Sequence, residues 1–167
     1  MVTPAWPACP GCGVRLPSAD ASPDARYNAS AACQQLYGEL SSDTLLRGYG
    51  AFIHQLAVDT YAAQHVGEHT RPIGVAFALI GLYLACDRGA SGRQVQHMHQ
   101  LLARRATTWP RFVPPAQAGA VTVLAVVQAR AGDDRDTMLR HWGQAVWTAW
   151  SAEHDRVGAL VARVMAE

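Results

Sequence analysis

Hydrophobic residues recur along the chain at the three- and four-residue spacing of amphipathic helices, separated by Pro, Gly and helix-capping residues. Ser30 is placed to cap a short helix that runs to Glu39. The triplet Ser41-Ser42-Asp43 then predicts a break and the cap of a longer helix that ends near His65. The apolar face of this second helix is formed by Leu45, Tyr49, Phe52, Leu56 and Tyr61.

Helical patterns continue along the rest of the chain. Pro72 opens an apolar run over 73–86, whose length fits a buried helix better than a membrane span. An amphipathic helix is predicted over 91–106, whereas the three prolines within 107–118 exclude regular structure there. Residues 120–131 are helical by length, and a last helix begins at Asp133 and runs to the end. The pattern therefore predicts an all-α protein, a single bundle of about six helices.

Ahead of the helices lies the motif Cys9-Pro10-Gly11-Cys12-Gly13, the sequence of a zinc knuckle. Two thiolates at this spacing grip one tetrahedral metal ion, and the glycines let backbone N–H groups turn towards the sulfurs. We therefore expect a zinc-knuckle loop over residues 1–28 and a helical domain over 29–167, which together form one structural unit. The alternative for a lone pair of this kind is a redox dithiol, but that motif usually opens a helix beside a sheet.

A knuckle supplies half of a coordination sphere, so other residues must complete it. If the first two helices form a hairpin that turns near Ser42, Cys33 faces residues 51–54, and His65 lies about 16 Å further along. We therefore expect Cys9, Cys12, Cys33 and His54 to bind zinc, with His65 as the substitute for His54. The alternatives are that Cys33 is a small core residue and that His54 is a buried, hydrogen-bonded side chain.

A second group of residues suggests a pocket. His54, Tyr61 and His65 share one face of their predicted helix. Trp147, Trp150 and His154 share a face of the last helix. If the two faces meet, they enclose a site for a small apolar molecule, in which His65 and Tyr61 are the candidate acid–base residues. The alternative is a packed aromatic core.

Asp59 stands in an otherwise apolar stretch of the second predicted helix. A buried carboxylate is costly without a partner, so Asp59 is expected to orient a histidine, accept from an arginine or face water. We assign it to the predicted pocket.

Composition narrows the function further. The net charge is +1 and no lysine is present, and the arginines are scattered, so no nucleic-acid partner is expected. Neither an export signal nor a membrane-spanning segment is recognised, which together with the knuckle favours a soluble protein of the reducing cytoplasm. The apolar third helix leaves a homo-oligomer open.

The same residues carry a resemblance to a known family. The knuckle, Cys33 ahead of Leu36-Tyr37, the segment Val58-Asp-x-Tyr-x-x-Gln-His65 and the tryptophans of the last helix together resemble an uncharacterised bacterial domain of unknown function. The resemblance spans nearly the whole chain. It implies a small helical protein with metal ligands, and it brings no established reaction.

Three functions remain open from the sequence. The first is a small zinc-binding helical protein with a mainly structural metal and a pocket for a small molecule. The second is a metal- or histidine-dependent hydrolase, lyase or isomerase that acts on a small metabolite. The third is an interaction adaptor, in which the knuckle and the Pro110–Pro115 loop present a protein-binding surface. An exposed apolar patch near Trp109 and Phe112 would support it.

Overall fold

The computed structural model describes residues 6–47, 52–106 and 108–166, and seven α-helices lie within them. Their bounds are α1 Ala31–Leu46, α2 His54–Gln64, α3 Pro72–Leu82, α4 Gly92–Arg105, α5 Val123–Gln128, α6 Asp133–Ala149 and α7 His154–Ala166. A π-helical turn, Tyr83–Asp87, continues α3, and a 3₁₀ turn, Ser151–Glu153, precedes α7. The prediction of an all-α fold is confirmed.

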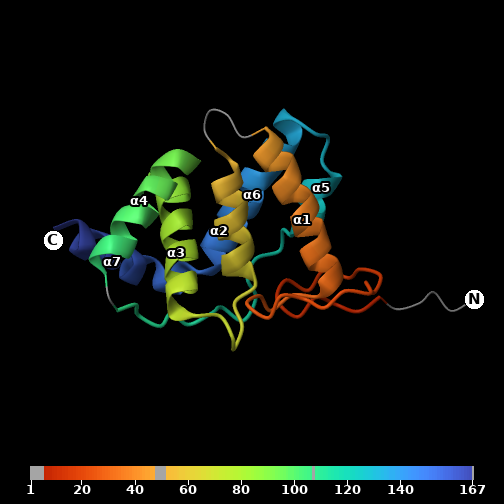
Figure 1. Ribbon diagram of the computed structural model, residues 1–167, viewed down its shortest axis with the longest axis horizontal. Coiled ribbons are helices and arrows are strands. Elements are labelled where there is room, and N and C mark those ends of the chain that lie inside the picture. The colour runs from red at the N-terminus through yellow and green to blue at the C-terminus, as the bar shows by residue number, and fades with distance from the viewer. Residues whose placement is uncertain (1–5, 48–51, 107, 167) are drawn as a thin grey trace, which may run out of the picture.

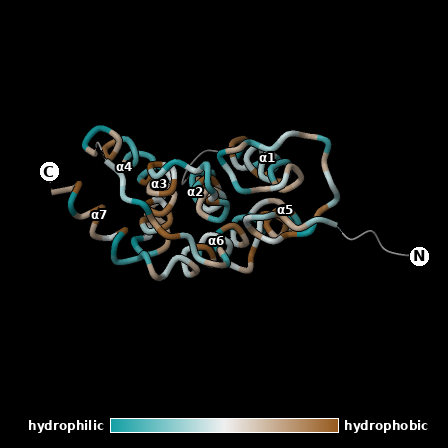
Figure 2. Tube along the Cα trace, turned by 90° about the horizontal axis from the view of Figure 1, so that it is seen from below, coloured by the Kyte–Doolittle hydropathy of each residue, from teal (hydrophilic) through white to brown (hydrophobic). Residues whose placement is uncertain are grey.

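The helices form two layers. Helices α1 to α4 stand side by side in a row, and α5, α6 and α7 lie against one side of that row (Figures 1 and 2). The second layer packs on the first: α5 contacts α1, α6 contacts α2 and to a lesser extent α3, and α7 contacts α3. The apolar core lies between the layers, where the largest fully buried side chains are Trp142, Trp147 and Trp150.

The N-terminal segment, residues 6–30, contains no helix. It runs as a loop below the first turn of α1 and the last turn of α2 (Figure 1). Ser30 ends it as the N-cap of α1, with its hydroxyl accepting from the Cys33 N–H at 3.2 Å. This cap places the end of the segment beside the base of both helices.

The predicted break at Ser41-Ser42-Asp43 is wrong, because α1 continues through it to Leu46. The polar side chains bond within the helix instead of ending it. The Ser42 hydroxyl donates to the Gly38 carbonyl at 3.1 Å, and Asp43 pairs with Arg47 one turn later at 2.8 Å. The second helix therefore begins at His54, and Tyr49 of its predicted apolar face lies outside the described residues.

Other boundaries follow local signals. Pro72 occupies the first turn of α3, and Ser91 forms a full capping box with Gln94 at the start of α4. The predicted helix over 120–131 is shorter, six residues of α5, and the predicted last helix is divided by the 3₁₀ turn into α6 and α7.

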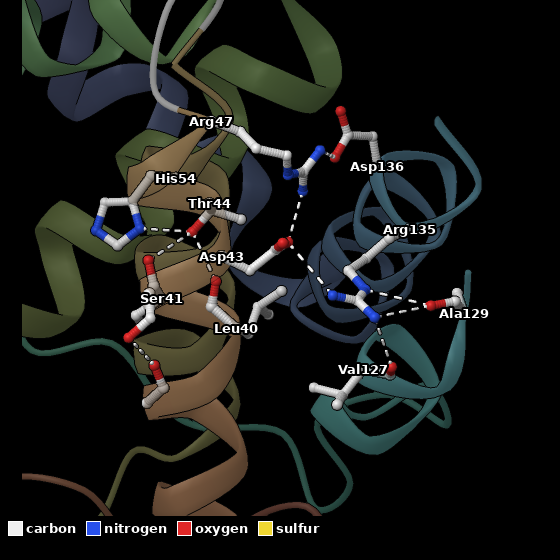
Figure 3. A network of polar contacts seen from close by, with 12 residues as sticks. Leu40, Ser41, Asp43, Thr44, Arg47, His54, Val127, Ala129, Arg135 and Asp136 are labelled. Atoms are coloured by element: carbon white, nitrogen blue, oxygen red, sulfur yellow. Dashed lines mark hydrogen bonds and ion pairs between the residues drawn. The ribbon is translucent and has the colours of Figure 1, made fainter. Parts of the chain in front are cut away.

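The upper end of α1 is tied to α5 and α6 by a polar network (Figure 3). Asp43 and Asp136 both pair with Arg47, at 2.8 and 2.7 Å. Arg135 pairs with Asp43 at 3.5 Å and also donates to the Ala129 and Val127 carbonyls that end α5. The network holds the end of α1 that is remote from the N-terminal segment. Among the described residues, no helix combines the length and apolarity needed to cross a membrane.

Candidate metal centre

The Cys9–Gly13 motif forms a tight turn. Its ends are held by an antiparallel bridge between Ala8 and Arg15, and the Cys9 N–H donates to the Val14 carbonyl at 2.8 Å. Gly13 has a φ of 76°, a conformation that costs glycine little. The turn brings both cysteine side chains to one side of the loop, facing the helices.

Three cysteines and one histidine meet where this turn contacts the helices. The Sγ atoms of Cys9, Cys12 and Cys33 and a ring nitrogen of His65 all lie within 4.8 Å of one another. Cys33 comes from the first turn of α1, and His65 is the C-cap of α2. Cys9, Cys33 and His65 are buried and Cys12 is partly buried. We call these four residues the Cys₃His cluster.

Two separations between the donor atoms match tetrahedral zinc. With Zn–S bonds of about 2.3 Å and Zn–N bonds of about 2.0 Å, a tetrahedron has S···S edges of about 3.8 Å and S···N edges of about 3.5 Å. The Cys12 and Cys33 sulfurs are 3.8 Å apart, and the Cys33 sulfur lies 3.4 Å from His65 Nε2. The residues present therefore fit one zinc ion without rearrangement of these two edges.

The orientation of His65 is set by its own helix. Its Nδ1–H donates to the Tyr61 carbonyl at 2.8 Å, one turn earlier. A proton on Nδ1 leaves the lone pair on Nε2, the atom that faces the Cys33 sulfur. Zinc-binding histidines are oriented in this way by a hydrogen bond from the second ring nitrogen.

Two further donors point at the sulfurs. The Ser30 backbone N–H lies 3.5 Å from Cys9 Sγ, and the Tyr61 hydroxyl donates to Cys33 Sγ at 3.8 Å. Hydrogen bonds of this kind favour the thiolate form of cysteine. They also explain why Tyr61 is fully buried with its hydroxyl inside the protein.

The three thiols do not titrate alike. Contacts with Cys12 and then Cys33 hold the pKa of Cys9 far below its usual range. The same close approach raises the pKa of Cys33, chiefly through Cys12 and then Cys9, because a second negative charge is disfavoured beside the first. A bound cation would allow several thiolates to share this space, and its binding would release their protons.

His54 does not join the cluster, and His65 takes the place predicted for it. His54 lies at the opposite end of α2, where its Nδ1 is 2.9 Å from the Thr44 hydroxyl of α1 (Figure 3). Because α1 continues past Ser42, the hairpin turns later than predicted. Cys33 precedes Thr44 by the same number of residues by which His65 follows His54, so the register that pairs Thr44 with His54 also pairs Cys33 with His65.

The knuckle packs closely on the end of α2. A side chain at Gly11 would collide with the Asn28 carbonyl and with the His65 ring, and Asn28 N–H donates to the His65 carbonyl at 2.8 Å. Glycine is therefore required at this position by the close approach of the loop to the helix.

Gln64, next to His65, holds another loop in place. Its side-chain amide donates to the Ala118 and Val121 carbonyls at 3.0 and 2.8 Å, and its oxygen accepts from the Trp142 indole at 2.9 Å. In the sequence, Gln64 stands out only as part of the Val58–His65 segment. Its position beside His65 and its polar side chain gave no sign of these partners, which lie more than fifty residues away in the sequence.

The predicted aromatic pocket is occupied by its own side chains. Trp147 and Trp150 are each 1% exposed, and their indole N–H groups donate to Asp87 and to the Ala63 carbonyl. His154 stacks on Trp147 with 3.7 Å between ring centres. Tyr61 and His65, the candidate acid–base pair, are fully buried at the Cys₃His cluster. The aromatic faces meet as packed core and leave no room at these residues.

Asp59 points elsewhere than expected. It lies against Gly81 of α3, and its carboxylate accepts from the Gln55 side chain at 3.1 Å. It lines a cleft with residues of α3 and α4 instead of the tryptophans. Gly81, inside an apolar helix, was the signal that a side chain of a neighbouring helix needs space there.

Fold and cluster together define a two-layer helical protein whose N-terminal knuckle meets its first two helices at a Cys₃His cluster. The chain belongs to a family of unknown function (DUF5946), which matches residues 7–151. This range includes all four residues of the cluster and ends before α7. No curated protein and no solved structure matches the chain.

Proposed function

We propose that this chain is a zinc-binding helical protein whose metal is structural. The observation that carries the proposal is the Cys₃His cluster, whose four donor atoms lie within 4.8 Å of one another. Its Cys12–Cys33 and Cys33–His65 separations are those of a zinc tetrahedron. When bound, the ion would supply a cross-link between the knuckle and the two helices. Cys9 and Cys12 would hold it from the loop, Cys33 from α1 and His65 from α2.

The donor set favours zinc over hard metal ions. Three thiolates and one imidazole suit zinc in a closed tetrahedral site, whereas calcium and magnesium require oxygen ligands. Four protein ligands also complete the sphere, so none of the positions that a catalytic zinc keeps for water is free. The burial of Cys9, Cys33 and His65 supports the structural role, since it keeps substrate away from the ion.

The same features argue against a redox dithiol. The knuckle cysteines lie on a turn closed by a β-bridge, and neither opens a helix, which is where redox pairs gain their reactivity. All four cysteines of the chain are unpaired. Zinc binding needs these thiols in reduced form, and a reducing compartment such as the cytoplasm keeps them so.

The two other functions have less support. A metal- or histidine-dependent enzyme would need Tyr61 and His65 to meet a substrate, but both side chains are fully buried. An adaptor would need an exposed apolar patch on the proline-rich loop. Phe112 is buried there beneath Arg156, and Trp109 packs edge-on against Phe77.

The test is the zinc content of purified protein, measured by elemental analysis together with thermal melting. The chain offers matched controls for both kinds of ligand. Cys33→Ser should lose zinc and melt at a much lower temperature. Cys86→Ser, outside the cluster, should keep the zinc content and the melting temperature of the wild type. His65→Ala should likewise lose zinc, whereas His54→Ala should keep one ion per chain.

The expected result is one zinc per wild-type chain, with unfolding of the N-terminal third on removal by a chelator. Protein without a stoichiometric metal, or variants at Cys33 and His65 that melt like their controls, would overturn the proposal. One zinc that is kept at low affinity by His65→Ala, without loss of stability, would point to an open and therefore catalytic site.

A further inference from the structure

A cleft of about 400 Å³ opens on the side of α2 that faces α3 and α4. Its walls are largely aliphatic, formed by Ile53, Leu56, Ala85, Ala90 and Val95. None of the Cys₃His residues lines it, so it is a separate site from the proposed metal centre. Its volume is that of a small-molecule pocket.

The carboxylate of Asp59 lies on the floor of this cleft. Asp59 is 4% exposed, although it lines the open space. Gly81 makes the position possible, because a Cβ there would collide with the carboxylate oxygen. Asp59 thus borders the cleft, but its side chain is almost inaccessible to bulk water.

This carboxylate has one neutral side-chain partner and no charged one among the described residues. Gln55 donates to both of its oxygens at 3.1 Å, and no ion pair to Asp59 is found among the described residues. Burial raises the pKa of Asp59 well above its usual value, because one neutral amide does not offset the loss of water. A buried carboxyl with a perturbed pKa at the floor of a cleft is a feature of binding sites.

The opposite wall is shaped by irregular backbone. The π-helical turn Tyr83–Asp87 ends α3, and Gly89 turns the chain with a φ of 64° into the start of α4. Ser91 and Gln94 line the cleft as well, but their side chains bond to each other's backbone in the capping box. Asp59 is therefore the polar group of the floor that can accept further hydrogen bonds.

We propose that this cleft binds a small organic amine, whose ammonium group is held by the Asp59 carboxylate and whose aliphatic body contacts Leu56 and Val95. An ammonium ion supplies both the charge and the hydrogen-bond donors that Asp59 lacks. The aliphatic walls suit a hydrocarbon chain of a few carbons.

Other ligand classes fit less well. A hard metal ion needs six or more oxygen ligands, and the cleft offers one carboxylate and one amide. A carboxylic acid would meet repulsion from Asp59, although Arg140 at the exposed rim offers it a partner. This alternative is decided by comparing probes of equal size and opposite charge.

The experiment titrates ¹⁵N-labelled, zinc-loaded protein with pentylamine, 1-pentanol or pentanoate at pH 7 and follows the amide signals of Gly81, Gly89 and Gly92. We expect pentylamine to shift these signals with a Kd on the order of 1 mM. It should bind at least tenfold more tightly than 1-pentanol. Asp59→Asn should abolish this preference, whereas Asp134→Asn, which removes the same charge from an exposed position of α6, should leave it intact.

A second measurement needs no variant. The carboxyl ¹³C signal of Asp59 in the wild type should report a pKa that falls when pentylamine saturates the cleft and stays unchanged with 1-pentanol. Equal binding of amine and alcohol, no shifts with pentylamine at about ten times the expected Kd, or tighter binding of pentanoate that is lost in Arg140→Gln would each overturn the proposal. Because no residue of the Cys₃His cluster lines the cleft, failure here leaves the proposed metal function standing.

Discussion

Gln64 offers the sharpest test of how the base of the molecule is held together. The side chain is 2% exposed and joins α2 to Trp142 of α6 and to the loop carbonyls of Ala118 and Val121. Gln64→Leu keeps a side chain of similar size but removes one acceptor and two donor bonds. The Trp142 indole N–H, fully buried, then has no partner, whereas the two carbonyls belong to the partly exposed loop residues Ala118 and Val121.

The expected loss follows from these contacts. A buried donor without a partner costs about 1–3 kcal/mol, and the loop bonds contribute about 0.5–1.5 kcal/mol each. Because the three contacts share one side chain and are not additive, we expect Gln64→Leu to lower the free energy of unfolding by about 2–4 kcal/mol. Gln64→Glu keeps the acceptor for Trp142 but turns a charged oxygen towards two carbonyls, so its loss should be larger at pH 7 than at pH 5.

The assay is urea unfolding followed by tryptophan fluorescence, with zinc content measured in parallel. Gln144→Leu is the matched control, since Gln144 is exposed on α6 and makes one long bond to Thr148 at 3.4 Å. It should change stability by less than about 0.5 kcal/mol. If Gln64→Leu keeps its zinc and lowers the free energy of unfolding by less than about 1 kcal/mol, the reasoning that the Gln64 side chain holds α2, α6 and the loop together is refuted.

Three further predictions concern the knuckle, the metal and the cleft. Gly11→Ala should destabilise the protein by about 1–3 kcal/mol in thermal melts, because its Cβ has no space, whereas Gly38→Ala, with open space on α1, should be neutral or stabilising. Bound zinc should be released as the pH falls, since protons compete for the thiolates; a chromophoric chelator measures the release. Asp59→Asn should be more stable than the wild type at pH 7 in urea unfolding. Burial raises the folded-state pKa of Asp59, so ionisation costs stability above the unfolded-state pKa of about 3.9, and the difference should vanish below it.

Local signals in the sequence predicted much of this structure. The all-α class, the turn at the knuckle, the Ser30 cap, Pro72 in the first turn of α3 and the helix that follows Ser91 all depend on neighbours within a few positions. Cys33 could also be placed with the knuckle, because a soft metal site needs a third sulfur or nitrogen and few candidates exist. Such inferences require chemistry and spacing but no knowledge of how helices pack.

The fourth member of the cluster could not be predicted in this way. The choice between His54 and His65 depended on where the hairpin turns, and Ser41-Ser42-Asp43 has the composition of a break. Whether Ser42 ends a helix or bonds back to the preceding turn is decided by the contacts of the whole helix. The extra helical turns of α1 moved the partner of Cys33 from one end of α2 to the other.

The aromatic residues show a different limit. Periodicity placed Tyr61, Trp147 and Trp150 on inward faces, and all three are buried. It could not say whether the faces leave space between them, because space depends on side-chain volumes from several helices at once. The cleft at Asp59 arose where small residues meet, at Gly81 and Gly89, and not where aromatic residues gather.

The α1–α2 hairpin is held at its upper end by ion pairs and at its lower end by the packing around the Cys₃His cluster. At the upper end the ion pairs of Asp43, Arg47 and Arg135 are between 19 and 30% exposed, and pairs of that kind contribute little in water. At the lower end the Cys₃His cluster is largely buried and joins three separate segments. A metal there would therefore stabilise the register of the hairpin as well as the N-terminal loop.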